Sequence, residues 1–351
     1  MVPEREHFSR DELTRVLSHY ELDPVEKVRE FPRGSHRSPK VILKTAAGRY
    51  LLKRRAAGRD RPGRVAFTHA LLWHLRQKGF PVPALVLTRD TQDSSLRLDG
   101  RVYELYEYAE GEHYSGSLDQ TLHAGRTLAK FHRAVRDFET PWRPPGGTYH
   151  DADLVRQGLQ AVPGSVSSHD SVVGHEAELL TMTQELLERY DAAAAAVRQC
   201  GYEQWPATTL HGDWHPGNML FAGPRVAIVL DFDSARRGPP SLDVANGMLQ
   251  FSILRGGGEP EEWPEWFDLT RMRRFFEGYR SRVRLDAGQR RAAFPLMTEA
   301  LIAESVVPIA ATGSLGWLPG FGVLQMVCRK VRWLERETPA ISAWLLDKES
   351  E

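Results

Sequence analysis

The sequence is poor in cysteine and has no long uninterrupted apolar run. Its 351 residues include only Cys200 and Cys328, which lie too far apart in the sequence to form a metal cluster or a disulfide framework by themselves. A membrane-spanning helix needs about 18 consecutive apolar residues, and no such run occurs. The most apolar region, residues 294–324, is interrupted by Glu299 and Glu304. We expect a buried helix there and no association with a membrane.

The sequence also lacks an excess of either charge. Lys and Arg number 46 and Asp and Glu number 46, so the long-range positive field typical of nucleic-acid binding is absent. The first residues, MVPEREHFSRDEL, are charged and contain no apolar stretch typical of a secretory signal. We therefore expect a protein of the reducing cytoplasm whose partners are small soluble molecules, with no nucleic acid among them.

What the sequence does contain is an ordinary globular composition, with 41% hydrophobic and 26% charged residues. A length of 351 residues exceeds that of one typical domain, so two lobes are expected. Strand patterns are confined to the first part of the chain and end near Tyr108, whereas helical patterns dominate afterwards. The sequence predicts an α+β fold with a smaller lobe at 1–108 and a larger, mainly helical lobe at 109–351.

The smaller lobe is predicted to contain an antiparallel sheet and two helices. Ser9 is a suitable cap for the first helix, and the small residues AAG between two apolar runs favour a hairpin. Gly79 is expected to end the second helix. The predicted helices are 9–20 and 65–78, and the predicted strands are 41–45, 49–53, 84–88 and 101–108.

The larger lobe is predicted to be helical, with Ser117 capping its first helix. Residues 141–174 are rich in Pro, Gly, Ser and His, and their weak periodicity indicates a long loop or insertion. The predicted helices are 117–138, 176–199, 241–254, 268–283, 295–307 and 323–347.

Two polar clusters bracket apolar strands in the stretches TLHGDWHPGNMLF (209–221) and VAIVLDFDSARRGPPSLDVA (226–245). Asp213 and Asn218 lie in one loop, and Asp231 directly follows the buried-strand pattern VAIVL. A hairpin would bring the three side chains together. Phosphoryl transfer needs a carboxylate to accept the proton of the attacking hydroxyl and oxygen ligands for Mg²⁺, and this set supplies both. The alternative is a capped turn and a strand end, since Asp, Gly and Asn favour loops.

On these motifs the chain resembles the aminoglycoside phosphotransferase and choline kinase superfamily, relatives of the protein kinases. HGDWHPGN fits the family's catalytic loop, HxDxxxxN, and the resemblance spans nearly the whole chain. It implies a protein-kinase-like bilobal fold that uses ATP and Mg²⁺. It also implies that Asp213 is the catalytic base and that Asn218 and Asp231 are magnesium ligands.

The resemblance places the nucleotide against the smaller lobe. Lys53, at the end of the strand RYLLK, would contact the α- and β-phosphates; the alternative is a solvated basic edge strand. Gly34 and Ser35 occupy the place of the loop that covers the nucleotide, where a plain surface turn is the alternative. Backbone groups near Glu107 and Ala109 would form hydrogen bonds with adenine; the alternative is that this segment is an ordinary strand end.

The chain also departs from the family pattern. The helix that carries a Glu partner for the lysine in kinases has Thr68 or His69 at the expected position. DFD replaces DFG, and we expect the added Asp233 to cap the following turn rather than to bind metal. Asp243 matches a family aspartate that braces the catalytic loop, with helix capping as the alternative. His211 is expected to be structural.

The resulting expectation is an enzyme that transfers the γ-phosphate of ATP to a hydroxyl of a small molecule. HPGNMLF and DFDSARRGP also look like bacterial stress-response kinases, so a protein Ser/Thr kinase is one alternative. A non-catalytic protein similar to the spore-coat members of the family is another. Glu299 and Glu304 could attract a cationic acceptor, but five residues of helix turn them about 140° apart, so both are left outside the predicted site. The sequence indicates no oligomeric state.

Overall fold

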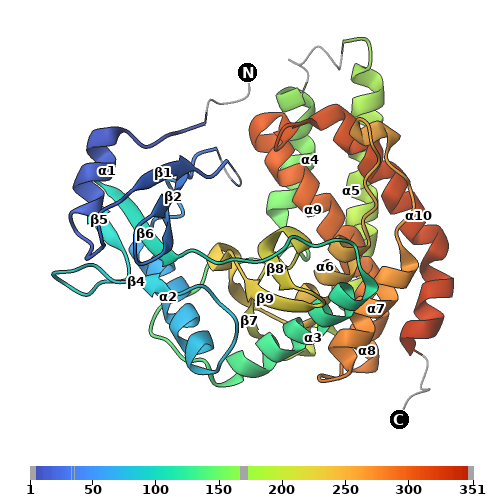
Figure 1. Ribbon diagram of the computed structural model, residues 1–351. Helices are drawn as coiled ribbons and strands as arrows, with labels where there is room; N and C mark the ends of the chain where they lie inside the picture. The colour runs from blue at the N-terminus through green and yellow to red at the C-terminus, as the bar shows by residue number, and fades with distance from the viewer. Residues whose placement is uncertain (1–4, 33, 35, 167–172, 347–351) are drawn as a thin grey trace. The chain divides into compact units, whose positions relative to one another are not determined.

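The computed structural model describes residues 5–32, 34, 36–166 and 173–346 (Figure 1). The chain forms two compact units, and each is assembled from separate stretches of sequence. The first unit contains Met1–His113, Asp137–Pro145 and Gly217–Ala235. The second contains Tyr114–Arg136, Gly146–Pro216 and Arg236–Glu351.

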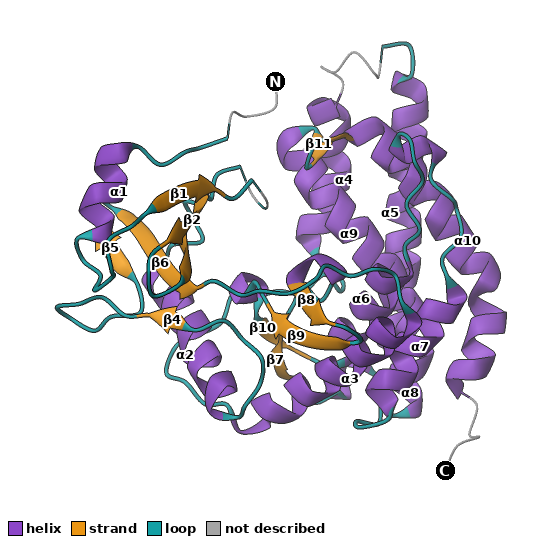
Figure 2. Ribbon diagram, viewed as in Figure 1, coloured by secondary structure: helices purple, strands orange, loops and turns teal. Residues whose placement is uncertain are grey.

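A six-stranded antiparallel sheet forms the centre of the first unit (Figure 2). Its strands follow the order β1-β2-β3-β6-β4, and β5 also pairs with β6. The predicted hairpin is confirmed, because Val41 on β2 lies opposite Leu52 on β3. The predicted run 84–88 forms only a two-residue strand, and β1 and β5 were not predicted. The strands are β1 (Lys27–Glu30), β2 (Lys40–Lys44), β3 (Arg49–Arg54), β4 (Leu85–Val86), β5 (Leu96–Leu98) and β6 (Arg101–Glu107).

Two helices complete this part of the first unit, as predicted. Helix α1 (Arg10–Leu17) is capped by Ser9, whose side chain accepts the N–H of Glu12. Helix α2 (Pro62–Gln77) buries its predicted apolar face and ends before Gly79, which has a φ of 63°. A core cluster between the sheet and α1 excludes water from the inner face of the strands. Its buried members are Val16, Tyr20, Val41, Leu43, Leu52, Leu96, Tyr103 and Leu105.

A second hairpin in the first unit carries the ends of the two polar motifs. It consists of β8 (Met219–Ala222) and β9 (Arg225–Val229) and is followed by the short 3-10 helix η5 (Phe232–Ser234). Glu112 and Phe221 exchange two backbone hydrogen bonds of 2.8 Å, which hold the hairpin to the segment that follows β6. Gly111 makes this approach feasible, because a Cβ there would lie 2.8 Å from Leu220 Cβ.

The second unit is mainly helical, as predicted (Figure 2). The expectation of a loop at 141–174 is wrong in part, because α4 (Asp153–Val166) occupies fourteen of these residues and buries Val155, Leu159 and Val162. The chain segments β7 (Thr208–Leu210) and β10 (Arg236–Gly238) pair antiparallel, as do β11 (Ser314–Leu315) and β12 (Leu318–Pro319). The helices are α3 (Leu118–Ala134), α4 (Asp153–Val166), α5 (Glu176–Gln199), α6 (Ser241–Ser252), α7 (Leu269–Arg280), α8 (Ala287–Arg291), α9 (Ala293–Thr312) and α10 (Gly320–Leu346).

Helices α3 and α7 approach closely because each presents a glycine to the other. A Cβ on Gly125 would lie 2.0 Å from the carbonyl oxygen of Phe275, and one on Gly278 would lie 2.1 Å from that of Leu122. No side chain fits at such distances, so the two helices pack backbone against backbone. This contact fixes the position of α3, which contributes His132 to the site described below.

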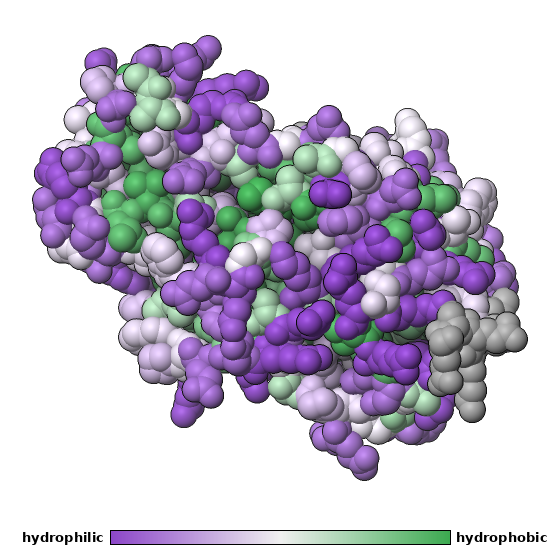
Figure 3. Space-filling model, turned by 60° about the horizontal axis from the view of Figure 1, so that its bottom comes forward, coloured by the Kyte–Doolittle hydropathy of each residue, from purple (hydrophilic) through white to green (hydrophobic). Residues whose placement is uncertain are grey.

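Helix α9 is the central helix of the second unit. By length and composition alone it could cross a membrane, but 72% of its most apolar window is buried inside the protein. It packs against α4, α5, α6 and α10, which explains its apolar character on all sides. The expected buried helix in this region is confirmed. The surface drawn in Figure 3 is predominantly hydrophilic, in line with the charged composition.

Candidate active site

The loop that follows β7 is held by a buried carboxylate on α6. Asp243 accepts the backbone N–H of His211 at 2.8 Å and that of Gly212 at 2.9 Å. Gly212 has a φ of 75°, a conformation that favours glycine. The predicted bracing role of Asp243 is therefore confirmed. The capping alternative is wrong, because Asp243 lies within the first turn of α6 and the N-cap position is Pro240.

A network of buried side chains extends this brace across two further helices. His132 on α3 lies with its Nε2 atom 3.2 Å from Asp243 Oδ2, and its Nδ1 atom lies 2.9 Å from the hydroxyl of Tyr279 on α7. Burial alone would raise the pKa of Asp243, but the hydrogen bond and charge of His132 outweigh it and the pKa is lowered. Asp243 therefore stays ionised, and its two carboxylate oxygens can accept the backbone N–H groups of the loop.

Asp213 lies in this braced loop, and its side chain is half-buried. Its Oδ2 atom is 3.6 Å from His215 Nε2. The residues on either side of it are anchored in the core, because His211 and Trp214 are fully buried and pack against the ring of Phe131. The expectation that His211 is structural agrees with this packing. The loop therefore presents Asp213 from a rigid support.

Asn218 and Asp231 both lie in the first unit, at the open end of the β8–β9 hairpin. The carbonyl oxygen of Asn218 accepts the N–H of Leu230 at 2.8 Å, so the backbone of Asn218 lies beside the residue that precedes Asp231. The side chain of Asn218 is buried and that of Asp231 is exposed. Asp231 has a φ of 59°, an uncommon conformation for a residue other than glycine. Carboxylate and amide oxygens are suitable donors for Mg²⁺.

Lys53 is buried at the end of β3 and is paired with Asp233, whose Oδ2 atom lies 2.6 Å from Lys53 Nζ. Arg55 Nη2 lies 2.9 Å from the other carboxylate oxygen. The expectation that Asp233 caps the next turn is wrong, because η5 has no side-chain cap and the carboxylate binds these two cations instead. Burial alone would lower the pKa of Lys53, but the charge of Asp233 outweighs it and the pKa is raised.

A second carboxylate completes this ion cluster, and the sequence reasoning did not predict it. Glu104 on β6 is fully buried, 2.6 Å from Arg55 Nε and 3.9 Å from Lys53 Nζ. His69 on α2 donates from Nε2 to Glu104 Oε1 at 2.6 Å, so α2 contacts the carboxylate beside the lysine rather than the lysine itself. Thr68 bonds the backbone of its own helix. Burial favours the neutral acid, yet Arg55 and the other cations lower the pKa of Glu104 to about 2.

The predicted nucleotide-covering loop is described only in part. Ser35 lies outside the described residues. Gly34 is exposed with a φ of 87°, and a Cβ there would lie 2.8 Å from Lys40 Nζ. Lys40 faces Lys53 across the β2–β3 ladder, and burial together with the charge of Lys53 lowers the pKa of Lys40. This second lysine was not predicted.

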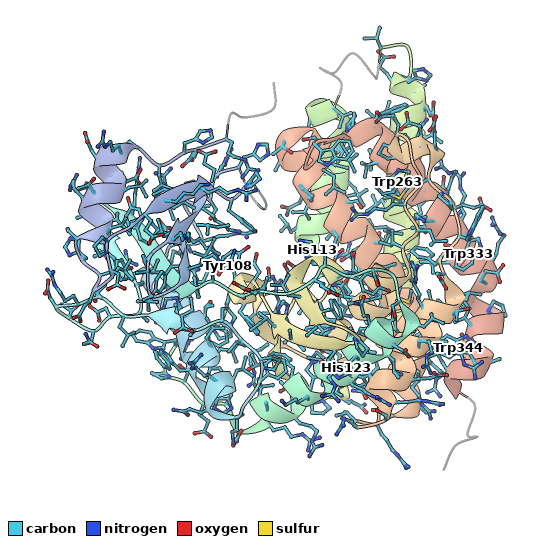
Figure 4. All side chains as sticks on the ribbon, viewed as in Figure 1. Tyr108, His113, His123, Trp263, Trp333 and Trp344 are labelled. Carbon is cyan, nitrogen blue, oxygen red and sulfur yellow. The ribbon has the colours of Figure 1, made fainter. Side chains whose placement is uncertain are left out.

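Glu107 and Ala109 lie at the end of β6, where the sheet ends and the chain continues past Tyr108 towards His113 (Figure 4). The N–H of Glu107 donates to Ala84 O and that of Tyr108 to Arg49 O, both at 2.9 Å. The backbone N–H of Ala109 donates to no acceptor within the described ranges. The backbone N–H of Ala109 is positioned in an extended segment, as a donor of a hydrogen bond to a nucleobase such as adenine would be.

Two carboxylates on α9 had been left outside the predicted site. Glu299 is buried and accepts from His150 Nδ1 and from the backbone N–H of Asp151, both at 2.8 Å. Glu304 has different surroundings, because the charge of Asp213 acts on it. The spacing of Glu299 and Glu304 on one helix does not show that Glu304 lies within range of the charge of Asp213, which depends on the tertiary fold.

A family model described as "Phosphotransferase enzyme family" matches residues 27–294. The chain belongs to this family. The predicted membership in the aminoglycoside phosphotransferase and choline kinase superfamily is thereby confirmed, as is the prediction of a phosphotransferase enzyme.

Among curated proteins, this phosphotransferase is similar to bacterial homoserine kinases. It is 25% identical to that of Rhodopseudomonas palustris over 305 residues, which cover 82% of this chain and 80% of the relative. It is 28% identical to that of Nitrobacter hamburgensis over 305 residues, with 82% and 79% covered.

Solved structures confirm the predicted kinase-like α+β fold. A microcompartment-associated aminopropanol kinase superposes with a TM-score of 0.69 at 15% identity, covering 96% of this chain and 100% of the other. An amicoumacin kinase in complex with AMP-PNP and Ca²⁺ gives a TM-score of 0.65 at 13% identity, covering 96% and 94%.

Proposed function

We propose that this phosphotransferase is a kinase that transfers the γ-phosphate of ATP, with Mg²⁺, to a hydroxyl group of a small molecule in the cytoplasm. The observation that carries the proposal is the braced loop: Asp243 fixes the backbone directly before Asp213 by two hydrogen bonds. A catalytic base needs such support because misplacement by about 1 Å is costly in rate. Residues 1–108 would form the nucleotide-binding lobe and residues 109–351 the catalytic and acceptor-binding lobe.

In the proposed reaction, Asp213 orients the acceptor hydroxyl and takes its proton. A bond forms between the acceptor oxygen and the γ-phosphorus, while the bond from that phosphorus to the β–γ bridging oxygen breaks and ADP leaves with that electron pair. The carboxylate then loses the proton to solvent. The protein forms no covalent bond to the substrates in this scheme, so it accelerates phosphoryl transfer by positioning the reactants and by electrostatic stabilisation.

The nucleotide would be held mainly by residues of the first unit. Lys53 would contact the α- and β-phosphates, helped by Lys40, and its pairing with Glu104 and Asp233 keeps it charged and in place. Gly34 and Ser35 would cover the phosphates, and the backbone near Glu107 and Ala109 would bond adenine. Asn218 and Asp231 would hold Mg²⁺, which supplies charge neutralisation of the phosphates when bound.

Both the relatives and the composition favour a small acceptor. The similar curated proteins are homoserine kinases, which match this chain over most of their length. The chain carries no net charge that would favour a polymeric ionic partner. We infer a compact hydroxyl compound as acceptor.

The proposal is tested by nucleotide binding and by turnover. Mg-ATP at a hundred times its dissociation constant should stabilise the protein by about 2.7 kcal/mol in a reversible melt. ATP consumption should then depend on an added small alcohol, in a panel that includes homoserine, aminoglycosides and a protein substrate such as casein. Stabilisation without turnover on any acceptor would favour a non-catalytic role, and turnover on protein alone would favour a Ser/Thr kinase.

A further inference from the structure

The chain ahead of α1 is held against the first unit by contacts that the proposed reaction does not yet use. The backbone N–H of Glu6 donates to the carbonyl oxygen of His36 at 2.9 Å. The carboxylate of Glu6 also lies 2.6 Å from Arg54 Nη2, at the end of β3. This N-terminal segment, residues 5–8, precedes residue 27, where the match to the family model begins. Its role therefore has to be inferred from its own contacts.

Arg5 extends from this segment to the proposed phosphate-binding residues. Its Nη2 atom donates to the carbonyl oxygen of Gly34 at 3.4 Å. Gly34 in turn lies against the ammonium group of Lys40, because a Cβ on Gly34 would be 2.8 Å from Lys40 Nζ. Lys40 lies opposite Lys53 in the β2–β3 ladder. Three cations from separate stretches of the chain therefore gather at one end of this hairpin.

The three cations differ in how they are paired. Lys53 has Asp233 as a direct partner, whereas no carboxylate in the part of the chain that the structure describes forms an ion pair with Arg5 or Lys40. Burial, followed by the charge of Lys53, lowers the pKa of Lys40, and the charge of Arg5 acts in the same direction. The more distant carboxylates of Asp231 and Asp233 only oppose this effect. An anion bound between Arg5 and Lys40 would relieve the repulsion.

The hydrogen bonds of Arg5 independently indicate a missing acceptor. Its Nη1 atom is shielded from solvent and donates to no acceptor among the described residues. A buried donor without an acceptor is costly, so a bound group that accepts there would be favoured. A guanidinium presents its N–H groups in a planar fork that matches two oxygens of one phosphate. The missing group is therefore an anion with the chemistry of a phosphate.

We propose that Arg5 binds the phosphate chain of the nucleotide together with Lys40, so that the N-terminal segment forms part of the nucleotide site. This inference rests on the proposed kinase function and adds to its nucleotide site a residue outside the family match. The two sites are continuous, because Asp231, a proposed Mg²⁺ ligand, acts on Lys40 through its charge. Arg5 holds the nucleotide and takes no part in proton transfer, so its loss should raise the KM for ATP with little change in kcat.

The test is calorimetric titration of AMP-PNP with Mg²⁺, and separately of adenosine, into the wild type and the Arg5→Gln variant. The dissociation constant of AMP-PNP should rise by roughly 10- to 100-fold in the variant, the range expected for a charged hydrogen bond. The affinity for adenosine should stay the same, because adenosine has no phosphate. Arg5→Lys should recover part of the AMP-PNP affinity, because it keeps the charge and loses the planar fork of donors.

Arg15→Gln is the matched control, because it makes the same chemical change on α1, where Arg15 forms an exposed ion pair with Asp99 at 2.8 Å. It should leave the affinity for AMP-PNP unchanged. Unchanged AMP-PNP affinity in Arg5→Gln, or an equal loss for AMP-PNP and adenosine, would overturn the inference, while AMP-PNP binding by the wild type would still support the kinase function.

Inorganic phosphate identifies the source of the anion. If Arg5→Gln weakened the binding of inorganic phosphate and left AMP-PNP binding unchanged, the cluster would be a separate anion site and the inference would be wrong. If the wild type bound no AMP-PNP, both the inference and the proposed kinase function would be wrong.

Discussion

Replacing Glu304 by Gln should make the unliganded protein more stable at alkaline pH. The pKa of Glu304 is raised from 4.5 to about 7, so the folded state binds its proton more tightly than the unfolded state does. Stability from this group is fully present below pH 4.5 and is lost as the pH rises towards 7. One pKa unit corresponds to about 1.4 kcal/mol, so ionised Glu304 costs up to about 3 kcal/mol above pH 7. Gln keeps the shape of the side chain and cannot ionise.

The assay is the free energy of unfolding of both proteins in denaturant from pH 5 to pH 8.5, without nucleotide. The curves should lie closest together at pH 5, the variant should gain stability relative to the wild type as the pH rises from 5 to 7, and the difference should level off above pH 7. Parallel curves across the whole range would refute the raised pKa that burial, followed by the charge of Asp213, gives Glu304.

Three further predictions address other parts of the structure. Glu104→Gln should destabilise the first unit by about 3–5 kcal/mol in denaturant unfolding at pH 7, because it leaves buried cations underpaired, and the difference should shrink in acid as the wild-type carboxylate is protonated. Asp243→Asn should lower kcat at least about tenfold with little change in ATP affinity measured by titration, because an amide replaces one of two accepting oxygens that hold the catalytic loop. Gly125→Ala should lower the melting temperature, since its Cβ would lie 2.0 Å from the oxygen of Phe275. Gly164→Ala on α4, where nothing lies within 4 Å, should leave it unchanged or raise it.

The features that the sequence predicts well are local. The apolar run before Asp231 identifies the strand β9, and the small residues AAG identify the β2–β3 hairpin. Capping by Ser9 and Ser117 depends on neighbouring residues and was also correct. Such features are set by backbone hydrogen bonds close in the chain, so they can be deduced without the tertiary fold.

The features that were missed depend on contacts between distant parts of the chain. Asp233 pairs with Lys53 across 180 residues, and the charge of Asp213 acts on Glu304 only because α9 packs in the second unit. Glu104 was detectable in principle, since a charged residue at an inward position of the strand RVYELYEY requires a buried partner. Its partner Arg55 could not be named without the register of β3 and β6.

Helix α4 was missed for a different reason. The composition of residues 141–174 indicated a loop, yet four apolar residues within it recur at helical spacing: Val155, Leu159, Val162 and Val166. Its small residue Gly158 allows a close approach to Val306 on α9. Tertiary packing against α9 stabilises a helix whose intrinsic propensity is weakened by Gly and Pro.

The central claim is that Asp213 acts as the base in phosphoryl transfer to a small alcohol. The most direct test measures ATP-dependent phosphorylation of the best acceptor by wild type and Asp213→Asn at saturating Mg-ATP, with thermal stabilisation by Mg-ATP measured in parallel. We predict that kcat falls by about 10²- to 10⁴-fold while the stabilisation is retained. Unchanged turnover in the variant would contradict the account.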